Sequence, residues 1–373
     1  MKLSQRRSLI DSSGIRKVFD LAAKMKDPIN LSIGLPDFDV PDVVKECAIG
    51  AIRNGKNRYT VTAGTPELRQ AVRDYYSRRS VPHDDVMIAS GTSGALFLVF
   101  LALLDPGDEV LVPDPYFVMY EALIKFLGAK PVLVDTYPDF RITREALEKA
   151  TTPKTKLLII NSPNNPTGRV YTEEECRIAA QFAMDKGIEF MSDEIYEPFC
   201  FDGEYVSPAR FHPAPIVISG LSKTVAMTGW RLGWLAGPAD LIKACTDIQQ
   251  YTFVCAPSVA QEAALEGLKF DMHAINDDYR NRRDIIYNGL VSAGYSVVKP
   301  GGAFYIFPEA PNGDGDAFVK EAIANNLLIV PGHVFSKRNT NFRISFASTP
   351  AKLKAGLEVL ARLAERYQVG ARS

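Results

Sequence analysis

The sequence predicts an α/β fold: a three-layer α/β/α large domain with a mostly parallel seven-stranded sheet, plus a smaller α+β domain. Its 373 residues exceed the size at which one core stops growing, about 250 to 300 residues. Apolar runs of strand length alternate with segments of helical period, which is typical of parallel strands joined by helical crossovers. Towards the C-terminus a long polar helix leads into shorter strands, which indicates a second domain of different construction.

The strands of the large sheet are expected at seven apolar runs. These runs are 86–89, 109–112, 131–134, 157–161, 188–192, 216–219 and 232–236. Two helix starts are marked between them, because Thr65 precedes a proline and Thr172 precedes three glutamates, so we expect both threonines to be N-caps. The longest apolar run, 95–104, is about half as long as a bilayer-spanning helix. It is expected to be a buried helix.

The smaller domain is expected to begin within a long Arg-rich helix over 270–293 and to end in a helix over 350–366. Its expected strands are 295–298, 303–307, 327–330 and 342–345. The sequence contains no low-complexity tract or long linker, so the two domains should pack against each other. We place the large domain at 42–284 and the small domain at 1–41 together with 285–373.

Composition narrows the class of partner. The net charge of -1 offers no basic footprint for nucleic acid or for an anionic membrane, so a small-molecule partner is expected. The five cysteines are odd in number and have no Cys-x-x-Cys spacing, which favours neither a disulfide framework nor a metal site. We expect buried thiols in a reducing compartment. The N-terminal segment lacks the apolar core of a signal peptide, so a cytoplasmic protein is expected.

The most informative segment is the Gly/Ser turn around Lys223, which follows an expected strand. A restrained, partly buried lysine beside cations can form an imine with an aldehyde cofactor. The alternative is an ordinary solvated lysine at a helix start. Arg231, eight positions further on, suits a phosphate. The SGTSG segment at 90–94, between a strand and the apolar helix, could also hold an anion, although such a segment is often only a turn.

Two further segments end expected strands. In NSPNNPTG at 161–168, Asn165 could direct an amide donor at a phenolate oxygen, or the segment could be a plain turn. Asp193 lies where ligands bind in α/β sheets, and its carboxylate could keep a pyridine nitrogen protonated. Alternatively, Asp193 and Glu194 could be a solvated helix cap.

Taken together, these motifs resemble a known family. NPTG at 165–168, DEIY at 193–196, SK at 222–223 and GWRLG at 229–233 are similar in order and interval to the class I/II aminotransferases. These are aspartate-aminotransferase-like members of the fold-type I pyridoxal-phosphate enzymes. The resemblance covers nearly the whole chain. It implies pyridoxal 5′-phosphate as cofactor and no metal.

The resemblance also implies roles for individual residues. Lys223 would be the Schiff-base lysine and proton shuttle, and Asp193 would pair with the pyridine nitrogen. Asn165 and Tyr196 would contact the ring phenolate, and Phe117 would stack on the ring. The phosphate contacts would come from Gly91, Thr92, Ser93, Ser222 and Arg231.

Other implied roles concern the substrate and a second subunit. Tyr59 resembles a tyrosine that family members lend to the neighbouring subunit's phosphate, which implies a homodimer with shared active sites. The α-carboxylate of the substrate would contact Gly34, Asn161 and Arg343. One position departs from the pattern, because Gly220 stands where many relatives carry serine, and Ser219 precedes it. The other phosphate donors would have to compensate.

The expected function is a ping-pong aminotransferase that moves the amino group of an L-amino acid to a 2-oxo acid, with 2-oxoglutarate as the expected acceptor. The alternative enzyme is a pyridoxal-phosphate-dependent β-eliminating lyase on the same fold. A regulator with a DNA-reading head is disfavoured by the short segment before Gly34, and an inactive homologue is disfavoured by the retained site residues. The donor stays open, with aspartate plausible: Arg16 could bind an acidic side chain, whereas Ile15, Tyr116 and Phe304 could shape an apolar pocket.

Overall fold

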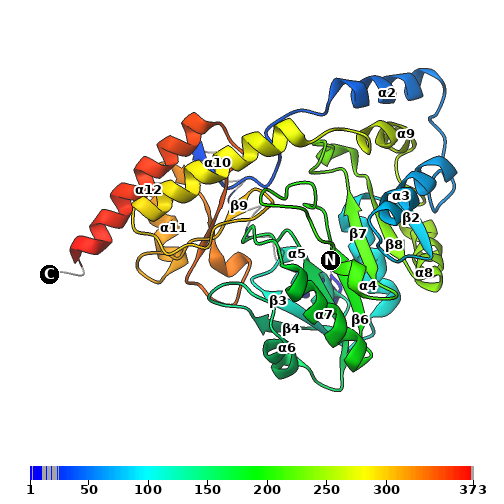
Figure 1. Cartoon of the computed structure of the whole chain (residues 1–373), viewed down its shortest axis with the longest axis horizontal. Coiled ribbons are helices and arrows are strands. Elements are labelled where there is room, and N and C mark those ends of the chain that lie inside the picture. The colour runs from blue at the N-terminus through cyan, green and yellow to red at the C-terminus, as the bar shows by residue number, and fades with distance from the viewer. Residues whose placement is uncertain (2, 11–13, 15–17, 19–22, 24, 371–373) are drawn as a thin grey trace.

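The computed structural model describes residues 1, 3–10, 14, 18, 23 and 25–370. Figure 1 shows a large α/β body next to a smaller lobe that carries the C-terminal helices. Helix α10 (His273–Ser292) runs from the body into the lobe and packs there against α12 (Pro350–Gly370). The body holds the long sheet, and the lobe holds the short strands.

The body is built on a seven-stranded sheet in the order β2-β8-β7-β6-β5-β3-β4. The strands are β2 (Asp85–Ala89), β3 (Glu109–Asp114), β4 (Lys130–Asp135), β5 (Thr155–Asn161), β6 (Glu189–Asp193), β7 (Ile216–Gly220) and β8 (Gly233–Gly237). The five strands from β7 to β4 are parallel, whereas β8 runs antiparallel to both of its neighbours, β7 and β2. The predicted mostly parallel seven-stranded sheet is therefore confirmed.

Helices cover both faces of this sheet because successive strand residues point to opposite sides. In β2, Met87 and Ala89 point to one face of the sheet, whereas Val86 and Ile88 pack with the helices of the other face. One face carries α4 (Gly91–Leu103), α5 (Val118–Phe126) and α8 (Ala239–Thr252). The other face carries α2 (Asp42–Arg53), α3 (Pro66–Arg78), α6 (Arg144–Ala150), α7 (Glu173–Lys186) and α9 (Ser258–Gly267). The predicted three layers are present, and α4 is buried as expected.

The two marked helix starts behave differently. Thr172 forms a full capping box with Glu175 at the start of α7, as predicted. The side chain of Thr65, in contrast, makes no capping hydrogen bond before α3. Its backbone carbonyl accepts the first helical bond from Arg69, so Pro66 and the backbone begin this helix without a side-chain cap.

Among the described residues, the lobe contains two small sheets and three α-helices. β1 (Ile29–Asn30) pairs in parallel with β10 (Leu327–Leu328), which joins the N-terminal segment to the lobe. An antiparallel sheet has the order β11-β12-β9, with bounds Val330–Pro331, Phe342–Ser345 and Tyr305–Ile306. The helices are α10, α11 (Gly315–Ala324) and α12.

Three predictions for the lobe were wrong in detail. The strand expected over 327–330 is divided between β10 and β11, which belong to different sheets. Residues 295–298 form no strand, because Tyr295 turns inward against Phe318 and Phe342. The strand expected over 303–307 is limited to Tyr305–Ile306, because the preceding Ala303 has a left-handed backbone with φ 54°. The lobe core thus combines aromatic rings with aliphatic side chains from its helices and its short strands.

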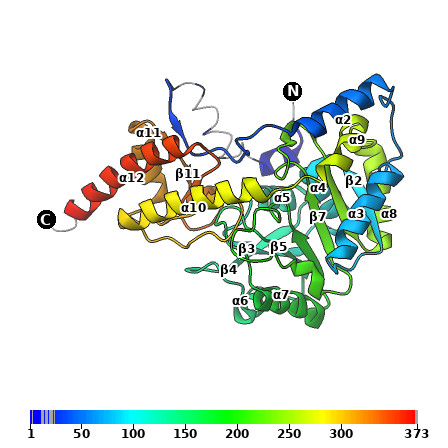
Figure 2. The same ribbon diagram turned by 45° about the horizontal axis from the view of Figure 1, so that its top comes forward.

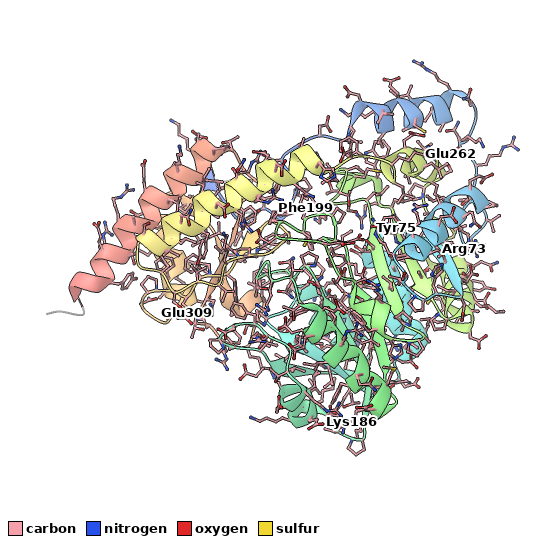
Figure 3. All side chains as sticks on the ribbon, in the orientation of Figure 1. Arg73, Tyr75, Lys186, Phe199, Glu262 and Glu309 are labelled. Carbon is pink, nitrogen blue, oxygen red and sulfur yellow. The ribbon has the colours of Figure 1, made fainter. Side chains whose placement is uncertain are left out.

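The remaining described elements are short 3-10 helices, at Gln5–Leu9, Pro208–Phe211, Thr228–Trp230 and Gly332–Val334. Cys176 and Cys245 are buried, but the other cysteines are only half-buried, so the expectation of uniformly buried thiols was wrong. Within the described ranges, no helix is both long and apolar enough to cross a membrane. Figure 2 shows the same layering from above, and Figure 3 shows side chains filling the space between the layers.

Candidate active site

A cavity of about 350 Å³ lies at the carboxyl ends of β5, β6 and β7, where ligands bind in open α/β sheets. Its size is within the usual range of small-molecule sites, about 300 to 1,000 Å³. Segments far apart in the sequence meet around it. The lining residues are Ile33, Gly34, Leu35, Thr92, Ser93, Phe117, Tyr120, Asn161, Asn165, Asp193, Ile195, Tyr196, Ser222, Lys223, Thr228, Arg231, Tyr305 and Arg343.

The amine of Lys223 reaches into this cavity from the loop after β7. Its Nζ donates a hydrogen bond of 2.8 Å to the carbonyl oxygen of Gly34. Burial, together with the positive charges of Arg343 and Arg231, lowers the pKa of Lys223 to about 8. A substantial neutral fraction of this amine is therefore present near neutral pH, as a nucleophile or a base requires.

Asp193 ends β6 and is buried, with 3% of its surface exposed. Its Oδ2 accepts a hydrogen bond of 2.6 Å from the Tyr120 hydroxyl, and its Oδ1 accepts one of 3.3 Å from the backbone N–H of Ile195. Burial raises the pKa of Asp193 to about 6, although both of these hydrogen bonds oppose the rise. The carboxyl group is thus mostly ionised at neutral pH although it is buried.

Arg343 belongs to β12 of the smaller lobe and lines the cavity from that side, where several contacts hold its side chain. Its Nη1 donates to Asn165 Oδ1 and its Nη2 donates to the Ser32 carbonyl oxygen, both at 2.9 Å. The guanidinium carbon lies 4.4 Å from the ring centre of Tyr305 and 4.5 Å from that of Phe335. The buried Nε has no partner among the described residues. This cation has a spare donor for an anionic ligand.

Two tyrosines and two asparagines connect these groups. The hydroxyls of Tyr196 and Tyr305 hydrogen-bond at 2.9 Å, and either can be the donor. Asn161 donates from Nδ2 to the Asp193 carbonyl at 3.0 Å and accepts at Oδ1 from the Asn165 backbone N–H at 2.9 Å. The Asn161 amide therefore ties β5 to β6 as well as lining the cavity.

The other end of the cavity is suited to an anion. It is formed by the start of α4, where backbone N–H groups lack helical partners. The guanidinium of Arg231 lies against Gly91: a Cβ at this glycine would be 2.4 Å from Arg231 Nη2. Arg231 itself has a left-handed backbone with φ 54°, a conformation that costs energy and is often kept for function. The buried Oγ of Ser222 has no partner among the described residues.

The family model described as aminotransferase class I and II matches residues 26–360. The chain belongs to this family. It is 40% identical over 378 residues to a probable aspartate aminotransferase of Methanocaldococcus jannaschii, covering 97% of this chain and 100% of that one. It is 37% identical over 366 residues to the aspartate/prephenate aminotransferase of Thermus thermophilus, with 94% of each chain covered.

The solved structures agree with this assignment. The aspartate aminotransferase from Thermus thermophilus with maleate superimposes with a TM-score of 0.93 at 35% identity, covering 97% of this chain and 100% of that chain. The chain is accordingly an aminotransferase with the fold of that family.

Most of the residues predicted for the site of this aminotransferase line one cavity, and two of them, Gly91 and Tyr59, are not in its described lining. Gly91 borders the anion end through its backbone and its contact with Arg231. Tyr59 does not line the cavity and is 83% exposed. Ser219 donates its hydroxyl to the Glu194 carbonyl oxygen at 3.2 Å, so it does not replace the serine missing at Gly220.

The residues suggested for side-chain specificity of the aminotransferase are not in the described lining. Tyr116 and Phe304 are buried outside this lining. Tyr116 donates its hydroxyl to Glu121. Phe304 packs behind the cavity wall, against the rings of Tyr196 and Tyr305. Ile15 and Arg16 lie outside the described residues.

Six lining residues of the aminotransferase were not among the residues predicted from the sequence, namely Ile33, Leu35, Tyr120, Ile195, Thr228 and Tyr305. Of these, Tyr120 is the one whose side chain contacts Asp193. Tyr120 hydrogen-bonds Asp193 across 73 positions of sequence. The available signal was its position three residues after Phe117 on one helix, which places both rings on the same face. That signal does not identify a partner.

Proposed function

We propose that this aminotransferase binds pyridoxal 5′-phosphate in the cavity and transfers the amino group of an L-amino acid to 2-oxoglutarate by a ping-pong mechanism. One observation carries the proposal. A lysine with a pKa lowered to about 8 and a buried, mostly ionised aspartate line the same cavity. Such a pair of oppositely perturbed groups in a cleft is typical of a catalytic site.

The residues present fit this cofactor. Three groups could donate hydrogen bonds to its phosphate. They are the unpartnered Oγ of Ser222, the backbone N–H groups at the start of α4, and the guanidinium of Arg231. Asp193 would hold the ring nitrogen, and Phe117 lies in the lining where it could stack. The amide of Asn165 is oriented by Arg343, which occupies its Oδ1 and leaves its NH₂ group to donate to the ring oxygen. Tyr196 would be the second contact to that oxygen.

When bound, the cofactor supplies a ring that takes up the electron pair left at the substrate Cα. Lys223 Nζ would remove the Cα proton, because its lowered pKa provides a neutral amine. The negative charge of Asp193 would hold a proton on the ring nitrogen by charge pairing.

The α-carboxylate would bind Arg343. Its planar guanidinium is pre-oriented by two hydrogen bonds and two aromatic rings, so little side-chain entropy would be lost on binding. Its unpartnered Nε adds a donor. Gly34 and Asn161 would also contact the α-carboxylate, since both line the cavity.

We propose aspartate as one donor within a broad range of common amino acids. The names of the relatives support this, since they include aspartate and aspartate/prephenate aminotransferases, and maleate in one solved relative is a dicarboxylate. The cations in the described lining are Lys223, Arg231 and Arg343, and each already has a proposed role. A donor screen is therefore the informative measurement.

We also propose a homodimer in which Tyr59 contacts the cofactor phosphate of the other subunit. Tyr59 and Tyr251 expose 83% and 87% of their surfaces, and the apolar Val61 exposes 65%. Large exposed apolar side chains of this kind are typical of interaction surfaces. A two-fold dimer would place the same surface on both subunits.

The test is to mix the purified, cofactor-saturated protein with L-aspartate and 2-oxoglutarate. We expect glutamate to form, with parallel double-reciprocal plots as the kinetic sign of a ping-pong mechanism, and we expect Lys223→Ala to abolish turnover. Release of ammonia and pyruvate from amino acids without an acceptor would instead establish the lyase and refute the proposal.

A further inference from the structure

The first turn of α5 brings two aromatic residues to the cavity. Phe117 is the N-cap of α5, and Tyr120 follows in its first turn, with 2% of its surface exposed. Their rings meet edge to face, with centroids 5.6 Å apart and an interplanar angle of 86°. The Phe117 ring thus braces Tyr120, whose hydroxyl donates to Asp193 Oδ2 at 2.6 Å.

Both oxygens of the Asp193 carboxylate are engaged. Oδ1 accepts from the Ile195 backbone N–H, and Oδ2 accepts from Tyr120. Among the described residues, Tyr120 is the only side chain hydrogen-bonded to this carboxylate. Because both partners donate, they stabilise the charged form and fix its plane. Loss of the Tyr120 hydroxyl would free one oxygen and leave it buried.

The charged and titratable groups around Asp193 come from several elements. Lys223 and Arg231 follow β7, Arg343 is on β12, and Tyr196 follows β6; all of them line the same cavity. The adjacent Glu194 does not compete for the same proton donors, because its Oε1 accepts from Ser192 at 2.8 Å and Ser207 at 2.6 Å. Burial raises the pKa of Glu194 to about 8, so Asp193 carries the negative charge of this pair at neutral pH.

We propose, resting on the proposed function, that Tyr120 is a positioning residue: its hydroxyl fixes the Asp193 carboxylate and keeps it ionised for pairing with the cofactor's ring nitrogen. Asp193 makes the contact with the ring, and Tyr120 acts only through Asp193. The substitution Tyr120→Phe removes the hydroxyl and retains the ring that packs against Phe117.

The experiment measures the affinity of the full-length apoprotein for pyridoxal 5′-phosphate from about pH 8 to about pH 6. Without the hydroxyl, the carboxylate takes up a proton at higher pH, so the affinity gap to the wild type should widen as the pH falls. We expect Tyr120→Phe to bind about threefold more weakly near pH 8 and about tenfold more weakly near pH 6, the scale of one ordinary hydrogen bond.

Tyr75→Phe is the matched control. Tyr75, labelled in Figure 3, also donates its hydroxyl to a buried carboxylate, that of Glu197, but it lies on α3 and outside the cavity. We expect this variant to keep the wild-type affinity at every pH. Thermal unfolding of both variants shows whether each one is folded.

A second comparison separates positioning from general packing. In the Asp193→Asn background, Tyr120→Phe should change the cofactor affinity less than about twofold. Equal losses in both backgrounds, or a Tyr120→Phe protein that matches the wild type at all pH values, would overturn the positioning role alone. A wild-type protein that does not bind pyridoxal phosphate would overturn the proposed function and this inference with it.

Discussion

Replacing Arg343 by lysine isolates the proposed recognition of the substrate carboxylate. The native guanidinium is 1% exposed, donates to Asn165 and to the Ser32 carbonyl, and lies between the rings of Tyr305 and Phe335. An ammonium group keeps the charge but cannot make these contacts and also bind a carboxylate through two parallel donors.

The expected loss follows from these contacts. At least one hydrogen bond between charged groups would be lost in the transition state, at about 1.5–3 kcal/mol. Since each 1.4 kcal/mol is about tenfold, kcat/KM for an amino acid should fall roughly 10- to 150-fold. An amine substrate without a carboxylate should be affected far less, because it does not contact this residue.

The assay is steady-state transamination by Arg343→Lys, with Arg338→Lys as control. Arg338 also lies over an aromatic ring, 4.2 Å from the centre of Tyr137, and donates to Asp135 at 2.7 Å, but it is exposed and outside the cavity. We expect the control to retain wild-type kcat/KM. Arg343→Lys values within threefold of wild type, or equal losses for amino acids and amines, would refute the reasoning.

Three further predictions concern the cofactor end of the site. Ser222→Ala should weaken binding of pyridoxal phosphate to the apoprotein about fivefold or more, because this buried Oγ has no other partner among the described residues. The control Ser219→Ala should stay within about twofold of the wild-type affinity, because that hydroxyl donates to the Glu194 carbonyl oxygen. Equal losses of affinity in the two variants would contradict the assignment. The rate of cofactor capture should reach half of its maximum near pH 8 and level off above that pH, since only the neutral amine of Lys223 reacts. A half-maximal rate near the ordinary lysine pKa of 10.5 would show that the pKa is not lowered. When the variants Tyr59→Phe and Lys223→Ala are mixed and exchange subunits, the activity should rise above that of either variant alone. In a mixed dimer, one of the two active sites contains both Tyr59 and Lys223. No gain in activity would exclude a shared site.

The strands of the fold were predictable where a segment follows a single sequence pattern. Apolar runs such as 157–161 and 216–219 became β5 and β7 because strands buried on both faces read as continuous apolar sequence. The direction of a strand leaves no such mark, so nothing distinguished antiparallel β8 from its parallel neighbours. In the lobe, aromatic packing around Phe318 and Phe342 replaced the strand expected over 295–298.

The site was predictable where residues form local motifs. Lys223, Asp193 and Asn165 each lie in a short motif after a strand, and these motifs meet at one edge of the sheet. Tyr120 belongs to no such motif. Its hydrogen bond to Asp193 depends on how α5 packs against the sheet, and no local sequence pattern predicts that packing. The role proposed for Tyr59 rests on contacts with a second subunit, and not on a motif within one chain.

The most direct test is to saturate the protein with pyridoxal phosphate, reduce it with borohydride and map the modified peptide by mass spectrometry. A single stable adduct on Lys223, absent from Lys223→Ala, is the predicted result. A protein that shows no reducible adduct, or one whose adduct lies on another lysine, would contradict the central claim that this amine carries the cofactor.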